Sequence, residues 1–171
     1  MVDRLARARA GDGRAFDELL TPVLDPAFRL AMTMLRDRGA AEDAVQEAAL
    51  KTWRKLDRLR SEAELKPWFL AIVANECRSS RRSRWWGVIR SDQVAQPGVE
   101  SDSRWADRVD LQAALDRLPH HHLLALSLYY HLDLPIEDVA RVLGCSPGAA
   151  RVRIHRAVTA LRPVLAMEVN L

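Results

Sequence analysis

Basic side chains dominate the stretch 147–167, in which no acidic residue occurs. Arg151, Arg153 and Arg156 follow one another closely there, and His155 stands among them. A guanidinium group pairs with phosphate oxygens and can donate two hydrogen bonds to a guanine edge in the major groove. These residue types therefore indicate contact with nucleic acid, although His155 alone is more typical of a surface side chain than of a base-reading one.

Two amphipathic helices joined by a short turn are needed to position these side chains. The stretch 135–143 carries an apolar face at helical spacing, made by Ile136, Val139, Ala140 and Leu143. Gly144 predicts a left-handed stop, and Ser146 with Pro147 predicts the N-cap and first turn of a second helix. That helix has an apolar stripe of Ala150, Ile154, Ala157, Leu161 and Leu165. The pattern is typical of a DNA-binding helix-turn-helix; the alternative is a helical hairpin with a solvated arginine face.

A second basic cluster ends a helix that is predicted to begin at Pro67. The first half of this helix is apolar, with Trp68, Phe69, Ile72 and Val73. The second half is basic, with Arg78, Arg81, Arg82 and Arg84. Aromatic side chains beside arginines fit a surface that holds single-stranded or melting nucleic acid. The alternative is that the aromatic residues are core and that the arginines stabilise the negative end of the helix dipole.

An acidic helix is predicted to precede this one, over residues 40–56. Its expected buried stripe is Val45, Ala48, Ala49, Thr52, Trp53 and Leu56. The opposite face aligns Asp43, Glu47, Leu50 and Arg54, with Gln46 beside them. An exposed leucine among acidic and amide side chains suggests a docking surface for a basic partner, although solvated acidic helix faces are common.

Composition narrows the possible functions of the 171-residue chain. A hydrophobic content of 49% and a net charge of +3 indicate a folded protein whose basic residues matter only where they cluster. Cys77 and Cys145 are far apart and predict neither a disulfide nor a zinc site. The adjacent residues 120–122 are all histidine, cannot converge on one metal from a helix, and are expected to be exposed at a helix start. We expect no cofactor, no metal and no enzyme, since no catalytic constellation or phosphate loop occurs.

Two helical domains joined by a flexible linker are the predicted architecture, in an all-α fold. Periodicity disappears over residues 87–103, where Gly, Pro, Ser and Asp alternate with scattered apolar residues. We therefore place the first domain at 1–86, a linker at 87–104 and a helix-turn-helix domain at 105–171. The absence of a signal segment and of a long apolar run favours a cytoplasmic protein without membrane insertion.

These segments together resemble one protein family. AEDAVQEAALKTWRKL is similar to the acidic helix of the sigma-2 domain of bacterial sigma factors, in the sigma-70 family. KPWFLAIVANECRSSRR resembles the promoter-melting helix of the extracytoplasmic-function (ECF) group, and the stretch from LDRLP to HRAVTALR resembles the sigma-4 domain of that group. The resemblance covers nearly the whole chain except the linker and the last few residues.

The resemblance implies a role for each cluster. RNA polymerase core would bind Asp43, Gln46, Glu47 and Leu50. The loop 57–66 would capture a flipped base of the minus-ten element, and the neighbouring contacts to that element would come from Asn75, Arg78, Ser79, Arg81 and Arg82. The minus-thirty-five element would meet Ser146, Ala149, Arg151, Val152, Arg153, His155 and Arg156. The resemblance also implies an anti-sigma factor as a partner and no small-molecule substrate.

Three residues depart from the family pattern. Ala149 and Val152 stand where relatives often carry Thr and Ser, which leaves apolar surface suited to a thymine methyl. Ser79 stands where an Asp is frequent. The alternative function is an ordinary helix-turn-helix regulator that binds duplex DNA without polymerase core. A nucleic-acid enzyme with a helical core would need a carboxylate or metal constellation that the sequence lacks.

Overall fold

Helices make up all the regular structure in the described part of the chain. The computed structural model describes residues 4–88 and 111–168, with side chains over 4–82 and 111–163. Its elements in order are α1 (Arg4–Arg9), α2 (Gly13–Leu35), α3 (Arg38–Arg54), η1 (Leu56–Arg58), η2 (Glu62–Glu64), α4 (Leu65–Val88), a helical stretch at 111–117, α6 (His120–Leu126), η3 (Ser127–His131), α7 (Ile136–Leu143) and α8 (Pro147–Glu168). The predicted all-α class is confirmed.

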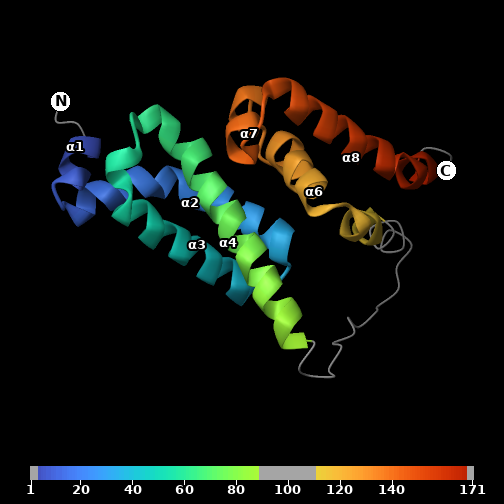
Figure 1. Ribbon diagram of the computed structural model, residues 1–171, viewed down its shortest axis with the longest axis horizontal. Helices are drawn as coiled ribbons and strands as arrows, with labels where there is room; N and C mark the ends of the chain where they lie inside the picture. Colours follow the sequence, from blue (N-terminus) through green and yellow to red (C-terminus); the bar gives the residue numbers. More distant parts are fainter. Residues whose placement is uncertain (1–3, 89–110, 169–171) are drawn as a thin grey trace.

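The long helices α2, α3 and α4 form a bundle (Figure 1), and an aspartate caps the N-terminus of each of the first two. Asp12 caps α2 by accepting hydrogen bonds from the backbone N–H groups of Arg14 and Ala15, and Asp37 caps α3 at Ala40 N, 2.8 Å away. The helix α2 continues through Pro22 and Pro26 as a single element. The bundle core includes Leu19, Leu30, Phe69, Leu70 and Val73.

Residues 53–66 differ from the sequence-based expectation at three points. Trp53, expected in the buried stripe, is 37% exposed, because it packs edge-on against the Phe16 ring at 4.8 Å instead of entering the core. The segment expected to be a loop is built from the short turns η1 and η2, and α4 starts two residues before Pro67. The buried side chains of Leu56 and Leu59 hold this segment against the bundle.

The predicted helix-turn-helix is present in α7 and α8. Gly144 ends α7 in the left-handed region at φ 62°, and Ser146 Oγ accepts a hydrogen bond from Ala149 N at 3.2 Å. The predicted stripe of α8 is buried at Ala150, Ile154, Ala157 and Leu161. In α7 the buried face also includes Val142, which the sequence analysis did not assign to it.

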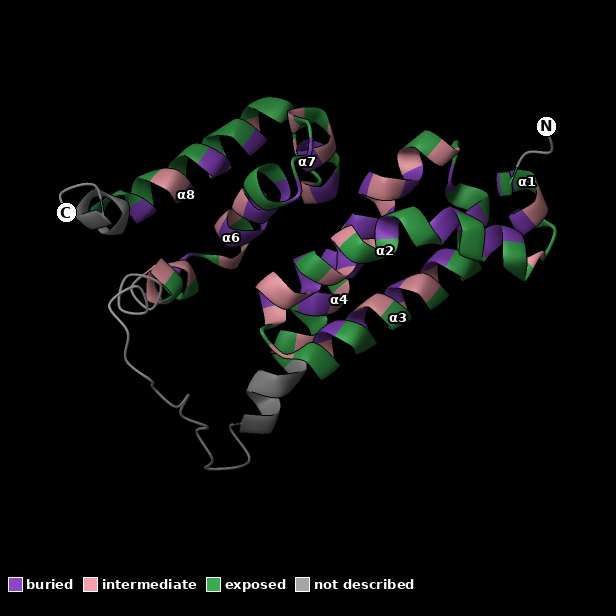
Figure 2. Cartoon of the chain, turned by 180° about the vertical axis from the view of Figure 1, so that it is seen from behind, coloured by how far each residue is buried: buried purple, intermediate pink, exposed green. Residues whose placement is uncertain are grey.

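One hydrophobic cluster joins the two ends of the chain. The core that contains Phe69 and Val73 of α4 also contains Val139 and Ala140 of α7 and Leu128 of η3. Figures 1 and 2 show α7 beside α4, and buried residues of both helices belong to this cluster. The predicted linker lies outside the described residues, apart from Gly87 and Val88 in the last turn of α4. The two predicted domains therefore pack on each other in this structure.

Candidate functional site

The acidic face of α3 is exposed as a unit. Asp43, Gln46 and Leu50 are exposed, with Leu50 at 46%, and Glu47 is half-buried. Lys51 Nζ lies 2.7 Å from Glu76 Oε2 of α4 and 3.5 Å from Glu47 Oε1. The hydrogen bond to Glu76 raises the pKa of Lys51, and the Glu47 charge adds to the effect. These pairs fix the face against α4 and leave Asp43 and Leu50 open to solvent.

A shallow cleft of about 220 Å³ continues this face onto α4. Its lining residues are Ala40, Asp43, Ala44, Glu47, Glu76, Ser79 and Ser80. Ser79, which was predicted to contact the minus-ten element, therefore lies beside the acidic face of α3. An aspartate at this position would add a further negative charge to a cleft that already contains Asp43, Glu47 and Glu76, whereas serine adds none.

The basic end of α4 is exposed at each position singled out from the sequence. Asn75, Arg78, Ser79, Arg81 and Arg82 are all solvent-accessible. Arg78 Nη2 donates to Asn75 Oδ1 at 2.5 Å, which orients both side chains along the same helix face. Three guanidinium groups on one exposed helix can neutralise backbone phosphates.

A cleft of about 250 Å³ lies where the expected base-capturing loop meets α4. Its lining residues are Arg58, Leu59, Glu64, Pro67, Trp68, Ala71 and Arg141. Trp68 is half-buried, so its side chain serves both the core and the cleft. Arg141 belongs to α7 and reaches this cleft only because the two halves of the chain pack together. Sequence reasoning missed it, since nothing in the local pattern of α7 places it beside residues 58–71.

The start of α8 presents the predicted recognition residues. Ser146, Arg151, Val152, His155 and Arg156 are exposed, and Ala149 and Arg153 are half-buried. Arg151 and His155 line a groove of about 470 Å³ together with Tyr129 and Tyr130 of η3. The tyrosines, 39% and 58% exposed, were missed in the sequence. Two adjacent aromatic residues at the end of an apolar helix were the available signal, because they cannot both face its core.

The three consecutive histidines have unequal environments. His121 is exposed as expected, but His120 is half-buried and its Nε2 has no hydrogen-bond partner. Burial lowers the pKa of His120 to about 4, and the Arg81 and Arg78 charges add to this. The expectation of a solvated helix start is therefore wrong for His120 and for His122, which is also half-buried, because packing against the rest of the molecule covers part of each side chain. Within residues 4–88 and 111–168, no His, Cys, Asp and Glu side chains cluster in a way that could hold a metal.

The Cys77 side chain is part of the core. Cys77 is completely buried in α4, and burial raises the pKa of its thiol to about 12. A thiol with this pKa is protonated at neutral pH and is a poor nucleophile.

None of the helices in the described ranges has both the length and the apolar character needed to cross a membrane.

Comparisons with known proteins agree with this geometry. Sigma-70 region 2 matches residues 19–87, and Sigma-70, region 4 matches residues 108–161. The ECF RNA polymerase sigma factor SigM of Mycobacterium tuberculosis is 31% identical over 165 residues, covering 96% of this chain and 84% of SigM. The RNA polymerase sigma factor CarQ of Myxococcus xanthus is 30% identical over 165 residues, covering 94% and 95% of the two chains.

A solved structure extends the similarity to three dimensions. The sigma factor RpoE of Bartonella quintana, crystallised in complex with the anti-sigma factor NepR, superposes with a TM-score of 0.70 at 30% identity, over 88% of this chain and 96% of RpoE. The chain belongs to the sigma-70 family of RNA polymerase sigma factors. Within that family it is an ECF sigma factor, a promoter-specific initiation factor built from regions 2 and 4. An ordinary helix-turn-helix regulator is not favoured.

Proposed function

We propose that the three exposed surfaces divide the work of initiation. The docking face of α3, made by Asp43, Gln46, Glu47 and Leu50, binds RNA polymerase core. The basic face of α4 with the cleft at residues 58–71 holds the opened minus-ten element. The start of α8, with Arg151, Arg153 and Arg156, grips the minus-thirty-five duplex. The observation that carries this assignment is the burial pattern, because each helix buries its opposite face and leaves the assigned residues accessible.

The proposal keeps the division into residues 1–86, 87–104 and 105–171. It also requires the two halves to separate on a promoter. Two elements about 25 base pairs apart lie about 85 Å apart along straight duplex at ~3.4 Å per base pair. A compact chain of this length has a radius of gyration of only about 15 Å. Val139 and Ala140 must therefore leave the core they share with α4 before both elements are held at once.

An anti-sigma factor is the further partner that we propose, since the related RpoE was crystallised with one. Such a partner would act by covering the same docking and DNA-binding faces. The proposed role needs no catalytic residue, cofactor or small-molecule substrate, and it places the protein with polymerase in the cytoplasm.

The test is transcription from sheared genomic DNA of the source organism by polymerase core lacking other sigma factors. Specific transcripts that appear only with this protein are expected, and mapping their starts gives the promoter. Co-elution with core is measured in parallel. No transcripts together with no co-elution would contradict the proposal and favour a regulator that binds duplex DNA alone.

A further inference from the structure

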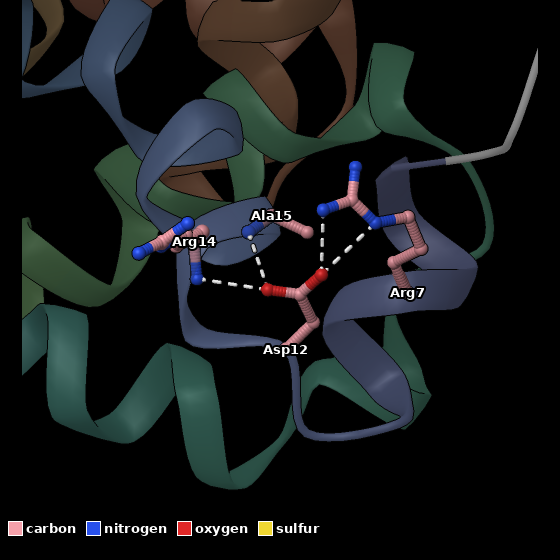
Figure 3. A network of polar contacts seen from close by, with 4 residues as sticks. All are labelled: Arg7, Asp12, Arg14 and Ala15. Atoms are coloured by element: carbon pink, nitrogen blue, oxygen red, sulfur yellow. Dashed lines mark hydrogen bonds and ion pairs between the residues drawn. The ribbon is translucent and has the colours of Figure 1, made fainter.

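The short helix α1 is fixed firmly to the bundle. Its Leu5 and Ala8 are each only 2% exposed and belong to the main core. Arg7 binds Asp12 through two hydrogen bonds, from Nε at 2.9 Å and from Nη2 at 2.6 Å. Figure 3 shows that the other oxygen of Asp12 accepts from the first turn of α2. The pairing with Arg7 and these backbone bonds lower the pKa of Asp12.

From this fixed position α1 holds the segment around η1. Arg9 Nε donates to the carbonyl oxygen of Leu56 at 3.4 Å, and Arg9 Nη2 donates to the carbonyl oxygen of Leu59. One guanidinium group therefore bridges the first residue of η1 and the residue that follows its end. A further contact joins Arg4 Nη2 to Glu62 Oε2 of η2 at 2.8 Å. This second contact is exposed and contributes less than the first.

The segment held by α1 forms one wall of the cleft beside Trp68. Arg58 and Leu59 line that cleft, with Glu64 further along. The side chains of Leu56 and Leu59 are buried, at 3% and 2% exposed, so the core holds them from one side and Arg9 holds their carbonyl groups from the other. The shape of the cleft wall therefore depends on a helix that lies outside the matched range 19–87.

We propose that Arg9 is a positioning residue that pre-orders the base-capturing wall of the minus-ten cleft. This inference rests on the proposed minus-ten role of residues 57–66. A loop that is already ordered loses little conformational entropy when an unstacked base enters beside it. Arginine suits this task because its planar fork reaches two carbonyl oxygens at once, whereas a lysine ammonium acts as a single point charge. Arg9 touches no DNA and acts through the backbone of 56–59.

The test compares Arg9→Gln with Arg14→Gln, in the full chain bound to polymerase core. Arg14 is exposed in the first turn of α2, and its substitution removes the same charge without touching the cleft. Binding is measured to fork-junction DNA carrying an open minus-ten strand, with each base varied in turn. We expect Arg9→Gln to weaken binding about tenfold and to flatten the preference among bases at one position. Affinity for core and for minus-thirty-five duplex should stay unchanged, and Arg9→Lys should restore part of the loss.

Hydrogen exchange of the free full-length chain gives a second readout that does not depend on DNA. Amides of residues 56–64 should exchange faster in Arg9→Gln, while those of α3 keep the wild-type rate. Unchanged exchange and an unchanged base preference in Arg9→Gln would overturn the positioning role. If the wild-type holoenzyme shows no base preference at any position of the minus-ten strand, the proposed function of residues 57–66 fails. The positioning role of Arg9 then fails with it. If Arg9→Gln does not fold, Arg9→Lys is compared with wild type instead, and it should show the same changes in hydrogen exchange and base preference to a smaller extent.

Discussion

Arg36 and Asp116 form an ion pair across the two halves of the chain, with Nη1 and Oδ2 2.7 Å apart. Arg36 ends α2 in a left-handed conformation, φ 54°, and Asp116 lies in the helical stretch 111–117. The side chains are 34% and 55% exposed, so the pair contributes at most about 1 kcal/mol. Arg29 adds a hydrogen bond to the carbonyl of His131 at 2.9 Å. These polar contacts orient the halves, and the shared apolar core supplies most of the stabilisation.

Replacing Arg153 should weaken recognition of the minus-thirty-five element. A two-hydrogen-bond contact of arginine with guanine contributes roughly 1 to 3 kcal/mol of discrimination. Arg153→Ala is therefore expected to reduce initiation at promoters that depend on this element and to leave affinity for polymerase core intact. Transcription and core binding are measured side by side. Arg162→Ala, an exposed arginine further along α8, is the control, and equal losses of initiation and core binding in Arg153→Ala would refute the assignment.

Charge reversal on α3 should act on polymerase binding first. Asp43→Lys with Glu47→Lys places two positive charges on the docking face and also removes the Glu47 contact to Lys51. We expect the dissociation constant for core to rise by at least about tenfold, since like charges at an interface cost several kcal/mol. Binding is titrated with labelled protein. Glu18→Lys, at an exposed position of α2, is the control and should leave core affinity unchanged. Unchanged core affinity in the double variant would contradict the docking face.

Acid should open the packed arrangement through His120. Its pKa is lowered from 6.5 to about 4, so the packed form binds fewer protons between these values than a form with His120 in water. The free energy that favours packing is therefore constant above pH 6.5, falls as the pH drops towards 4, and levels off below that. The groups facing the imidazole are Arg78 and Arg81 of α4 and His121 of its own helix, and protonation adds repulsion from each charged one.

The acid-induced opening is measured as a change in the radius of gyration, by small-angle X-ray scattering between pH 7 and pH 4. Wild type should expand as the pH falls, and His120→Gln should expand less over the same range. His122 has a lowered pKa as well, mainly from burial, but the charges that add to its shift are those of His121, Arg156 and Arg153 in the same half of the chain, so its titration should not separate the halves. His131→Gln, at an exposed histidine, is the control. Identical curves for wild type and His120→Gln would show that His120 is not the sensitive group.

Thr52→Val should stabilise the bundle. Thr52 is completely buried, and its Oγ1 has no hydrogen-bond partner in the described residues. Valine has nearly the same shape and helix propensity but no hydroxyl group to desolvate. The free energy of unfolding in urea is expected to rise by about 1 kcal/mol. Thr33→Val is the matched control, because Thr33 Oγ1 donates a hydrogen bond to the carbonyl oxygen of Arg29 at 3.0 Å. Removing this hydrogen bond should not raise the free energy of unfolding.

Local features of the fold were predictable because they rest on neighbouring residues. Gly144 and Ser146 specify the turn between α7 and α8 through backbone conformation and capping alone, and periodicity identified the buried stripe of α8. The exposure of the docking face on α3 was predictable for the same reason. Contacts between distant segments were not, because they depend on which faces meet. Arg141 in the Trp68 cleft and the half-buried ring of His120 near Arg78 and Arg81 follow from contacts between distant segments, which no local pattern encodes.

In the proposed function, the core shared by α4 and α7 also sets the order in which polymerase and promoter are bound. The docking face of α3 is already exposed in the packed form, so encounter with polymerase is bimolecular and speeds up with polymerase concentration. Release of Val139 and Ala140 from that core is unimolecular, so the polymerase concentration cannot accelerate it. Formation of a stable promoter complex should therefore reach a plateau rate in rapid-mixing experiments, equal to the opening rate. Release of the apolar residues of α7 thus limits the rate of the step between polymerase binding and promoter binding.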